Sequence, residues 1–393
     1  MKRFLGSFLK VSLFLSLSFC FTCAIGGKLL SAAEPVRIGA VFSMTGWAGF
    51  LGTPQKEICT AMVDDINSKG GIGGRPIELC FEDDQSNPTN AAIAATKLIR
   101  DKKVVIVVGG SIVDSAMAVV PVCEQEKVPF INAGPAMILS KKWVFSVGPG
   151  AIRSAVQMLE FGIKDLDAKR IANFHGADGD GRGGGKAITD NIGKYPGASI
   201  VIEETFEPSD VSMIPQLTKI KAANPDVILL YATAGPASVI IKNYKQLGMV
   251  TPVVGFAGIT APIFAKNAGE IAEESKLICL TVPIMIAEKM APNDPYRKNI
   301  YEPVKKLLQE KYGPAARPTL YHGSAYDGLK AAIEAIKAAK DIDPASIRDA
   351  LEKIRFDGFL GAFACTPTDH QGAPVASFRP VEFRNGEWIP YVK

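Results

Sequence analysis

A glycine-rich stretch from His175 to Ala187 contains the residues whose types and spacing most invite a chemical interpretation. It reads His-Gly-Ala-Asp-Gly-Asp-Gly-Arg-Gly-Gly-Gly-Lys-Ala. A nucleotide-binding P-loop needs glycine where Asp180 stands and serine or threonine where Ala187 stands, so the stretch is not a P-loop. A calcium loop needs oxygen ligands at alternate positions. Asp178 and Asp180 fit that pattern, but Arg182 does not.

The interpretation that remains is a strand-to-helix loop over residues 176–185, followed by a helix that ends at Lys194. Such loops lie at the carboxyl end of an α/β sheet, where ligands bind. Free main-chain amides and a helix N-terminus suit a polar or anionic group. Arg182 could add a bidentate contact to a carboxylate. A flexible loop without a ligand is the alternative that the sequence leaves open.

Three other strand-end segments carry candidate binding residues. The segment 109–115 opens a helix, and its amides with Ser111 and Ser115 could hold a carboxylate, unless Ser111 or Asp114 only caps the helix. The segment 131–136 offers Ala133, Gly134 and Pro135, unless it is only a tight turn. Trp47 and Phe50 could form an apolar wall, unless they belong to the core.

Residues for catalysis or cofactor binding are poorly represented. The sequence has no G-x-S-x-G elbow and no H-E-x-x-H motif, and its three histidines are scattered, at His175, His322 and His370. The acid pair Asp83-Asp84 follows a strand and indicates a capped or solvated turn. No G-x-G-x-x-G follows the first strand. The sequence therefore predicts neither an enzyme nor a bound cofactor.

Strands and helices alternate along the chain, which predicts an α/β protein with parallel sheets covered on both faces. Strands are predicted at residues 36–43, 76–81, 104–108, 128–131, 170–174, 199–205, 226–231, 252–256 and 277–282. Further helices are predicted at residues 51–68, 88–100, 114–126, 151–164, 214–223, 236–247, 296–312, 321–340 and 344–354, and short strands in the tail 359–391. The pattern restarts after residue 150, which indicates two similar lobes.

Residues 1–33 have the layout of a cleaved secretory signal: basic residues, an apolar run and a small-residue site at Ser31-Ala32-Ala33. An uncleaved anchor is the alternative. A lipoprotein is disfavoured because the large Phe19 precedes Cys20. The remaining 360 residues exceed the size of one core, so two lobes are expected.

Charge and cysteine content limit the kinds of partner that the mature chain is expected to bind. The signal removes four of the 44 basic residues, which leaves 40 against 40 acidic ones, so nothing attracts nucleic acid. The odd cysteine number leaves a free thiol or an intermolecular pair, and the missing C-x-x-C spacing disfavours zinc. The pairing of these cysteines stays open: Cys59, Cys80, Cys123, Cys279 and Cys365.

Several segments in a fixed order resemble the leucine-binding (branched-chain amino acid) family of type I periplasmic solute-binding proteins of ABC transporters. These segments are residues 43–46, 65–74, 82–84, 109–122, 127–131 and 253–255. The resemblance implies the type I periplasmic-binding-protein fold, with two doubly wound parallel-sheet lobes joined by a three-crossover hinge. It places lobe 1 at residues 34–147 plus 283–360, and lobe 2 at residues 148–282 plus 361–393.

The same resemblance implies a monomeric periplasmic protein that captures a small polar ligand between closing lobes and delivers it to an inner-membrane ABC permease. The implied ligand residues are Trp47, Phe50, Ser111, Ser115, Ala133, Gly134 and Pro135 in the first lobe. In the second lobe they are Asp178, Asp180, Arg182, Thr233, Ala234 and Ala257.

The second-lobe positions depart from the pattern of amino-acid binders. Ala257 stands near the acid that holds the ligand ammonium in the family, and Asp180 replaces an aromatic residue. A buried ammonium needs an acceptor, which Asp180 could supply. We therefore expect an amino acid, in the first place an aliphatic one. A small organic carboxylate or an amide is the alternative ligand, and a ligand sensor that signals to a partner is the alternative role.

Overall fold

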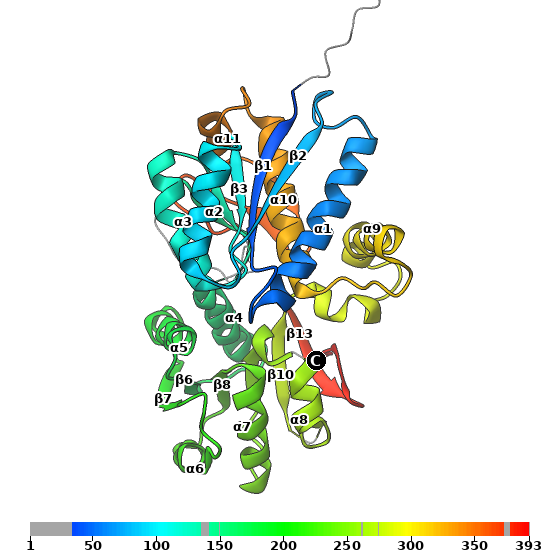
Figure 1. Cartoon of the computed structure of the whole chain (residues 1–393). Coiled ribbons are helices and arrows are strands. Elements are labelled where there is room, and N and C mark those ends of the chain that lie inside the picture. Colours follow the sequence, from blue (N-terminus) through cyan, green and yellow to red (C-terminus); the bar gives the residue numbers. More distant parts are fainter. Residues whose placement is uncertain are drawn as a thin grey trace, which may run out of the picture. The chain divides into compact units, whose positions relative to one another are not determined.

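The structure of the chain is a computed structural model, which describes residues 34–134, 141–148, 150–260, 262–273, 275–372 and 378–392. The expected signal segment 1–33 lies outside this range. Two sheets built mainly of parallel strands, each covered by helices, account for most of the described residues (Figure 1). This is the α/β architecture that the alternating pattern predicted.

The first sheet has five strands in the order β2-β1-β3-β4-β5, and every neighbouring pair is parallel. Its strands are β1 (Val36–Phe42), β2 (Ile77–Asp83), β3 (Ile106–Gly109), β4 (Phe130–Asn132) and β5 (Val144–Ser146). Strand β5 was not predicted, because three residues carry too little pattern to identify a strand.

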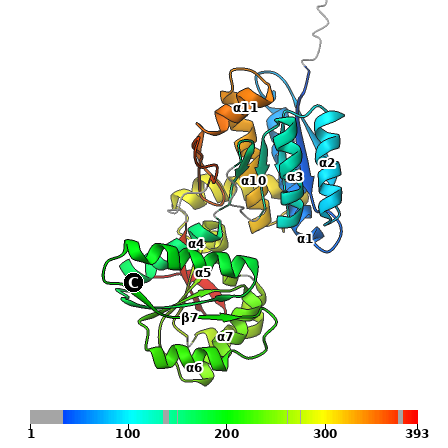
Figure 2. The same ribbon diagram turned by 90° about the vertical axis from the view of Figure 1, so that its left-hand side faces the viewer.

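Helices cover both faces of the first sheet (Figure 2). Helices α2 (Pro88–Arg100) and α3 (Val113–Glu126) lie on one face, and α1 (Gly49–Ser68) and α10 (Leu320–Ala338) on the other. Successive strand side chains point to opposite faces. Ile38 and Ala40 accordingly belong to the core beneath α1 and α10, whereas Val41 belongs to the core beneath α2 and α3.

The second sheet has seven strands in the order β14-β13-β10-β9-β8-β6-β7. Its parallel strands are β6 (Arg170–Gly176), β7 (Ser199–Phe206), β8 (Val227–Tyr231), β9 (Val253–Phe256) and β10 (Leu277–Thr281). The tail adds the antiparallel pair β13 (Arg379–Arg384) and β14 (Glu387–Pro390) to the edge of this sheet.

Helices also cover both faces of the second sheet (Figure 2). Helices α4 (Ala151–Lys164) and α5 (Gly179–Asn191) pack together on one face, and α6 (Ile214–Ala223), α7 (Ala234–Gln246) and α8 (Pro262–Glu273) cover the other. Short helical turns follow at η1 (Ile192–Lys194), η2 (Ala257–Thr260) and η3 (Pro283–Lys289). Helix α8 was not predicted.

The two sheets share one topology. In each, the first strand along the chain is flanked by the second strand on one side and the third on the other, and the fourth and fifth follow. The winding direction therefore reverses between β1 and β3 in the first sheet and between β6 and β8 in the second. These are the switch points at which open α/β sheets bind ligands.

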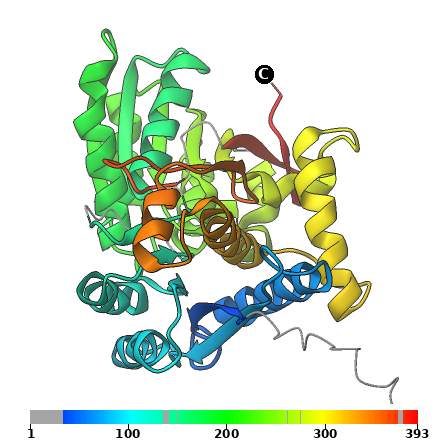
Figure 3. The ribbon, with the colours of Figure 1, turned by 90° about the horizontal axis from the view of Figure 1, so that it is seen from above.

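The part of the chain between β10 and β13 forms further helices beside α1. A π-helical turn, η4 (Arg297–Tyr301), leads without a break into α9 (Glu302–Tyr312), so the helix predicted at residues 296–312 is present with a π-helical turn near its start. Figure 3 shows α9 (yellow) and α10 (gold) alongside α1 (blue), as their contacts require. Helix α11 (Pro344–Leu351) packs on α10, and β11 (Arg355–Asp357) pairs antiparallel with β12 (Ala362–Ala364).

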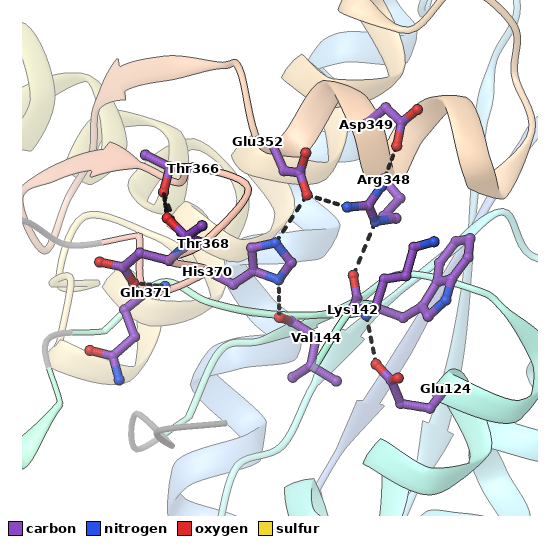
Figure 4. A network of polar contacts seen from close by, with 12 residues as sticks. Glu124, Lys142, Val144, Arg348, Asp349, Glu352, Thr366, Thr368, His370 and Gln371 are labelled. Atoms are coloured by element: carbon purple, nitrogen blue, oxygen red, sulfur yellow. Dashed lines mark hydrogen bonds and ion pairs between the residues drawn. The ribbon is translucent and has the colours of Figure 1, made fainter. Parts of the chain in front are cut away.

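The chain passes between the two sheets three times: after β5, after β10 and after β12. A polar network fixes the last of these passages beside the first sheet (Figure 4). His370 contacts the carbonyl of Val144 through Nδ1 (3.0 Å) and Glu352 through Nε2 (3.2 Å). Arg348 contacts the same Glu352 carboxylate and donates to the carbonyl of Lys142 (3.1 Å).

Candidate functional site

The loops at the two switch points, together with the first turns of the helices that follow them, contain many of the residues that the sequence pattern singled out. In the first sheet, Ser43 follows β1 and Ser111 comes shortly after β3. In the second sheet, Asp178 comes shortly after β6 and Thr233 shortly after β8. Because the carboxyl ends of parallel strands lie at one edge, these loops form the candidate site.

The first-sheet loops are joined by a buried hydrogen-bond network centred on Gln55. The amide of Ser43 donates to Ser111 Oγ (2.9 Å), and Ser111 Oγ donates to Gln55 Oε1 (2.5 Å). Gln55 Nε2 donates to the carbonyl of Ala133 (2.9 Å) and, more weakly, to Ser324 Oγ (3.4 Å). Gln55 is 1% exposed and Ser111 2% exposed. We call these five residues the Gln55 network.

The serine hydroxyls beside the Gln55 network differ in the hydrogen bonds that they already make. The proton of Ser111 is already donated to Gln55, so a bound carboxylate must find other donors. Among the described residues, the buried Ser43 Oγ and Ser115 Oγ have no hydrogen-bond partner. Helix α3 has Ile112 at its N-cap and no side-chain cap, so capping by Ser111 or Asp114 is wrong as an explanation of the segment.

Ala133 and Gly134 lie at the end of β4, beside the Gln55 network. Ala133 is fully buried, and its carbonyl accepts from Gln55. The amide of Gly134 donates to Asn132 Oδ1 (3.1 Å), as in a side-chain-stabilised turn. Pro135 lies outside the described residues.

Trp47 and Phe50 are exposed rather than part of the core. Trp47 is 70% exposed and Phe50 63%. The Phe50 ring meets the ring of Tyr321 edge to face, with centroids 6.1 Å apart. The alternative of core residues is therefore wrong, and an apolar wall beside the β1 loop remains.

Asp83 organises the loop that carries these aromatic residues. Its carboxylate accepts from the amides of Met44 (2.9 Å) and Thr45 (3.2 Å) and from the Thr45 hydroxyl (2.6 Å). Burial acts to raise the pKa of Asp83, but the hydrogen bonds from Thr45, Gln85 and Met44 outweigh it and leave the pKa lowered. The predicted turn is present, since the amide of Asn87 donates to the carbonyl of Asp84, but Asp83 is the last residue of β2 and Asp84 is buried rather than solvated.

The glycine-rich stretch is mostly helix, so the predicted loop at residues 176–185 is wrong beyond Ala177. Helix α5 already begins at Gly179, with Asp178 as its N-cap. Asp178 Oδ1 accepts from the amide of Gly181 (2.9 Å) and so satisfies one free N–H of the first turn. The exposed Arg182 donates to the carbonyl of Ala177, and Asp180 is the second residue of the helix.

Glycines are needed in α5 because the helix lies directly on strands β6 and β8. A Cβ atom on Gly184 would stand 2.5 Å from the ring of Tyr231, and one on Gly185 would stand 2.1 Å from the ring of His175. The buried Tyr231 ring in turn stacks on Phe256 at 4.1 Å. The glycine content therefore reflects close packing of α5 on the sheet. In the sequence alone, the same glycines had indicated a loop.

The other second-sheet candidates lie at the ends of β8 and β9. Thr233 is the exposed N-cap of α7, although its side chain makes no capping bond, and Ala234 is buried. Ala257 is half-buried in η2, where its carbonyl accepts from Thr260 Oγ1 (2.8 Å). The structure thus joins two first-sheet candidates, Ser111 and Ala133, through Gln55 but gives the second-sheet candidates no comparable common partner among its described residues.

The described residues show no cluster of three or more His, Cys, Asp or Glu side chains with the arrangement of a metal site. The five cysteines of the described chain are free thiols, and burial raises the pKa of Cys59, Cys123 and Cys279. None of the helices within the described ranges is both long and apolar enough to cross a membrane.

Gln55, the central residue of the Gln55 network, was missed by the sequence interpretation. A signal was present: Leu51, Gln55 and Ile58 fall on one helical stripe, and all three are buried. A single amide on an otherwise apolar stripe must find hydrogen-bond partners inside the protein. Its partners come from three distant segments, however, and no local pattern could have named them.

Three comparisons with known proteins give matches that cover most of this chain. Residues 35–387 match the family model described as periplasmic binding protein. The Leu/Ile/Val-binding protein homolog 3 of Brucella melitensis is 25% identical over 338 residues, which cover 85% of this chain and 87% of the relative. An extracellular ligand-binding receptor from Rhodopseudomonas palustris superimposes with a TM-score of 0.72 at 26% identity, covering 91% of this chain and 99% of the receptor.

A further solved structure shares the fold. It is the branched-chain amino acid transporter substrate binding protein LivJ from Streptococcus pneumoniae, in complex with isoleucine. Its TM-score is 0.68 at 24% identity, with 90% of this chain and 97% of that protein covered.

Proposed function

Because this chain belongs to the periplasmic binding protein family, we propose that it captures an amino acid, in the first place leucine, isoleucine or valine, for an ABC importer. It is an exported binding protein and not an enzyme. The relatives named for leucine, isoleucine and valine support the solute class. The observation that carries the proposal is the Gln55 network, which ties together strand-end loops at the switch point of the first sheet.

The proposed solute site has one half on each sheet. The first half comprises Trp47, Phe50, Ser111, Ser115, Ala133, Gly134 and Pro135. The second comprises Asp178, Asp180, Arg182, Thr233, Ala234 and Ala257. The corresponding lobes are residues 34–147 plus 283–360 and residues 148–282 plus 361–393, and the shared strand order of the two sheets supports this division.

We assign the solute carboxylate to the first turn of α3. The amides of Val113, Asp114 and Ser115 have no acceptor within the helix, because the first turn of any helix leaves its N–H groups free. No side chain caps them. A carboxylate there also gains from the positive end of the helix dipole.

We assign the solute ammonium to Asp180, since the apolar Ala257 offers no carboxylate at the end of β9. Trp47 and Phe50 then provide apolar surface for an aliphatic side chain. Contacts with both halves favour a closed state, which is a population shift driven by differential affinity.

Export and delivery complete the proposal. Residues 1–33 form a signal peptide that is removed, and the mature chain acts as a periplasmic monomer that docks on an inner-membrane permease without binding nucleic acid. Mass spectrometry of the exported protein should give the mass of a chain that begins at Glu34. A mass that includes the first 33 residues would contradict the removal.

A thermal-shift screen tests the solute class, because a ligand that binds the folded state raises the apparent midpoint of unfolding by mass action. The screen includes aliphatic amino acids, aromatic carboxylates and amides. The largest shift is expected with leucine, isoleucine or valine. A shift with carboxylates lacking an ammonium, and none with amino acids, would contradict the proposed solute class.

A further inference from the structure

The Gln55 network has a fixed direction, because both of its ends are main-chain groups. The amide of Ser43 can only donate, and the carbonyl of Ala133 can only accept. Gln55 must therefore turn Nε2 towards Ala133 and Oε1 towards Ser111, and Ser111 must donate its proton to Gln55. The amide orientation of Gln55 thus follows from the bonding pattern alone.

The network joins loops that are far apart in the sequence. Ser43 follows β1, Ser111 comes after β3, Ala133 follows β4, and Ser324 lies on α10. One side chain of α1 links all of them. Its amide is buried, so each of its bonds would be costly to lose, since a buried polar group that loses its partner gains no water in exchange.

The main chains at these strand ends also pack in close contact. A Cβ atom on Gly134 would stand 1.7 Å from the carbonyl oxygen of Gly110, and one on Gly109 would stand 2.3 Å from that of Val41. The main chains of strands β1 and β3, and those of the loops after β3 and β4, are therefore in direct contact. A shift of the β3 loop must move the β4 loop, and Gln55 is the side chain that links both of them to Ser43 after β1, through Ser111.

We infer that Gln55 is a positioning residue of the solute site: it holds the β1, β3 and β4 loops at the spacing that solute binding requires. The inference rests on the proposed function and extends it to a residue that need not touch the solute. Because Ser111 donates its proton to Gln55, Ser111 can only accept a hydrogen bond from a bound molecule.

Substitutions at Gln55 distinguish a positioning role in the solute site from a general contribution to stability. Gln55→Met keeps the size of the side chain but has no donor, and Gln55→Glu places a carboxylate against the Ala133 carbonyl. Ile347→Val is the matched control, because Ile347 is fully buried in the core cluster that contains Ala133 and makes none of these hydrogen bonds. With leucine as the probe, calorimetry should show at least about tenfold weaker binding for both Gln55 variants. The control should stay within about twofold of the wild type.

The contrary result would be a Gln55→Met protein that loses thermal stability like the control and binds leucine as the wild type does. Gln55 would then be an ordinary core residue. If Gln55→Met does not fold, Gln55→Asn provides the comparison, because it keeps both polar groups but is one methylene too short to reach Ser111 and Ala133 together.

Amide hydrogen exchange without solute distinguishes failure of this inference from failure of the proposed function. The Ser43 amide, which donates into the network, should exchange at least about tenfold faster in Gln55→Met than in Ile347→Val at equal global stability. Equal exchange would overturn the positioning role. If the wild-type protein binds no amino acid, the solute proposal fails, and the exchange rates still decide the role of Gln55.

Discussion

At the first sheet, hydrogen-bonding side chains join the strand-end loops to one another. At the second sheet, α5 lies directly on the strands because it has glycines where it faces them. Gln55 and Ser111 connect the ends of β1, β3 and β4 by hydrogen bonds. Gly184 and Gly185 instead let α5 approach Tyr231 and His175. Loss of hydrogen-bonding side chains should therefore damage the first region most, and added atoms should damage α5, as they would the close contacts at Gly109 and Gly134 of the first sheet.

The largest effect is expected from adding one methyl group to α5. In Gly185→Ala the new Cβ would stand 2.1 Å from the buried His175 ring, and forced overpacking costs about 3 kcal/mol of unfolding free energy. Gly193→Ala is the matched control, since no atom lies within 4 Å of its Cβ position. Urea unfolding of the two variants measures the difference, and similar losses would mean that α5 does not lie directly on β6.

Removal of one hydroxyl from the first region should have the next largest effect. Ser111→Ala leaves the Ser43 amide and Gln55 Oε1 without partners, which costs about 2 kcal/mol of unfolding free energy. The exposed Ser199 provides the control, because Ser199→Ala should change stability by less than about 0.5 kcal/mol. Chemical denaturation checks both, and a neutral Ser111→Ala would show that the network contributes little.

Helix α10 supplies Ser324 to the Gln55 network and also carries a buried carboxyl group, Asp327. Burial raises the pKa of Asp327 to about 7, although amide hydrogen bonds from Leu360 (2.7 Å) and Phe359 (2.5 Å) act to lower it. The folded state therefore binds this proton more tightly than the unfolded chain. The resulting stability is fully present below the ordinary carboxyl pKa and is lost as the pH rises through about 7.

Unfolding measured from pH 4 to pH 8 should show this loss in the wild type and a flatter profile in Asp327→Asn, which cannot ionise. The slope is the informative quantity, because the substitution also perturbs the two amide bonds. Identical slopes for both proteins would mean that Asp327 does not titrate in this range.

The smallest effect is expected at the N-terminus of α5. Asp178→Ala removes the cap on the Gly181 amide and should cost about 1 kcal/mol of unfolding free energy. Asp190→Ala, in the last turn of the same helix, removes only an exposed pair with Lys186 and should cost about 0.3–0.5 kcal/mol. If both variants lose equal stability, the side chain of Asp178 is not needed as a cap.

The architecture was predictable from the sequence because its signals are local. Hydrophobic periodicity and glycine stops identified most strands and helices, and the alternation of strand and helix gave the sheet type. The short β5 and helix α8 were missed, and the start of α5 was placed seven residues too late, at residue 186 instead of Gly179. Glycine has low helix propensity, so the glycine-rich stretch was interpreted as a loop. Close packing against His175 and against Tyr231, which is distant in sequence, accompanies a helix instead.

The candidate site was predictable only in part. Strand ends in a parallel sheet share an edge, so the loops after β1, β3, β6 and β8 could be named in advance. The role of each side chain could not. Ser111 donates inward to Gln55, and Asp178 caps α5, because each found a partner inside the protein.

Calorimetric titration of the processed chain with L-leucine tests the central claim most directly. The account predicts saturable binding of one leucine per chain, competed by isoleucine and valine. Absence of binding by all three amino acids, together with saturable binding of a carboxylate that has no ammonium group, would contradict it.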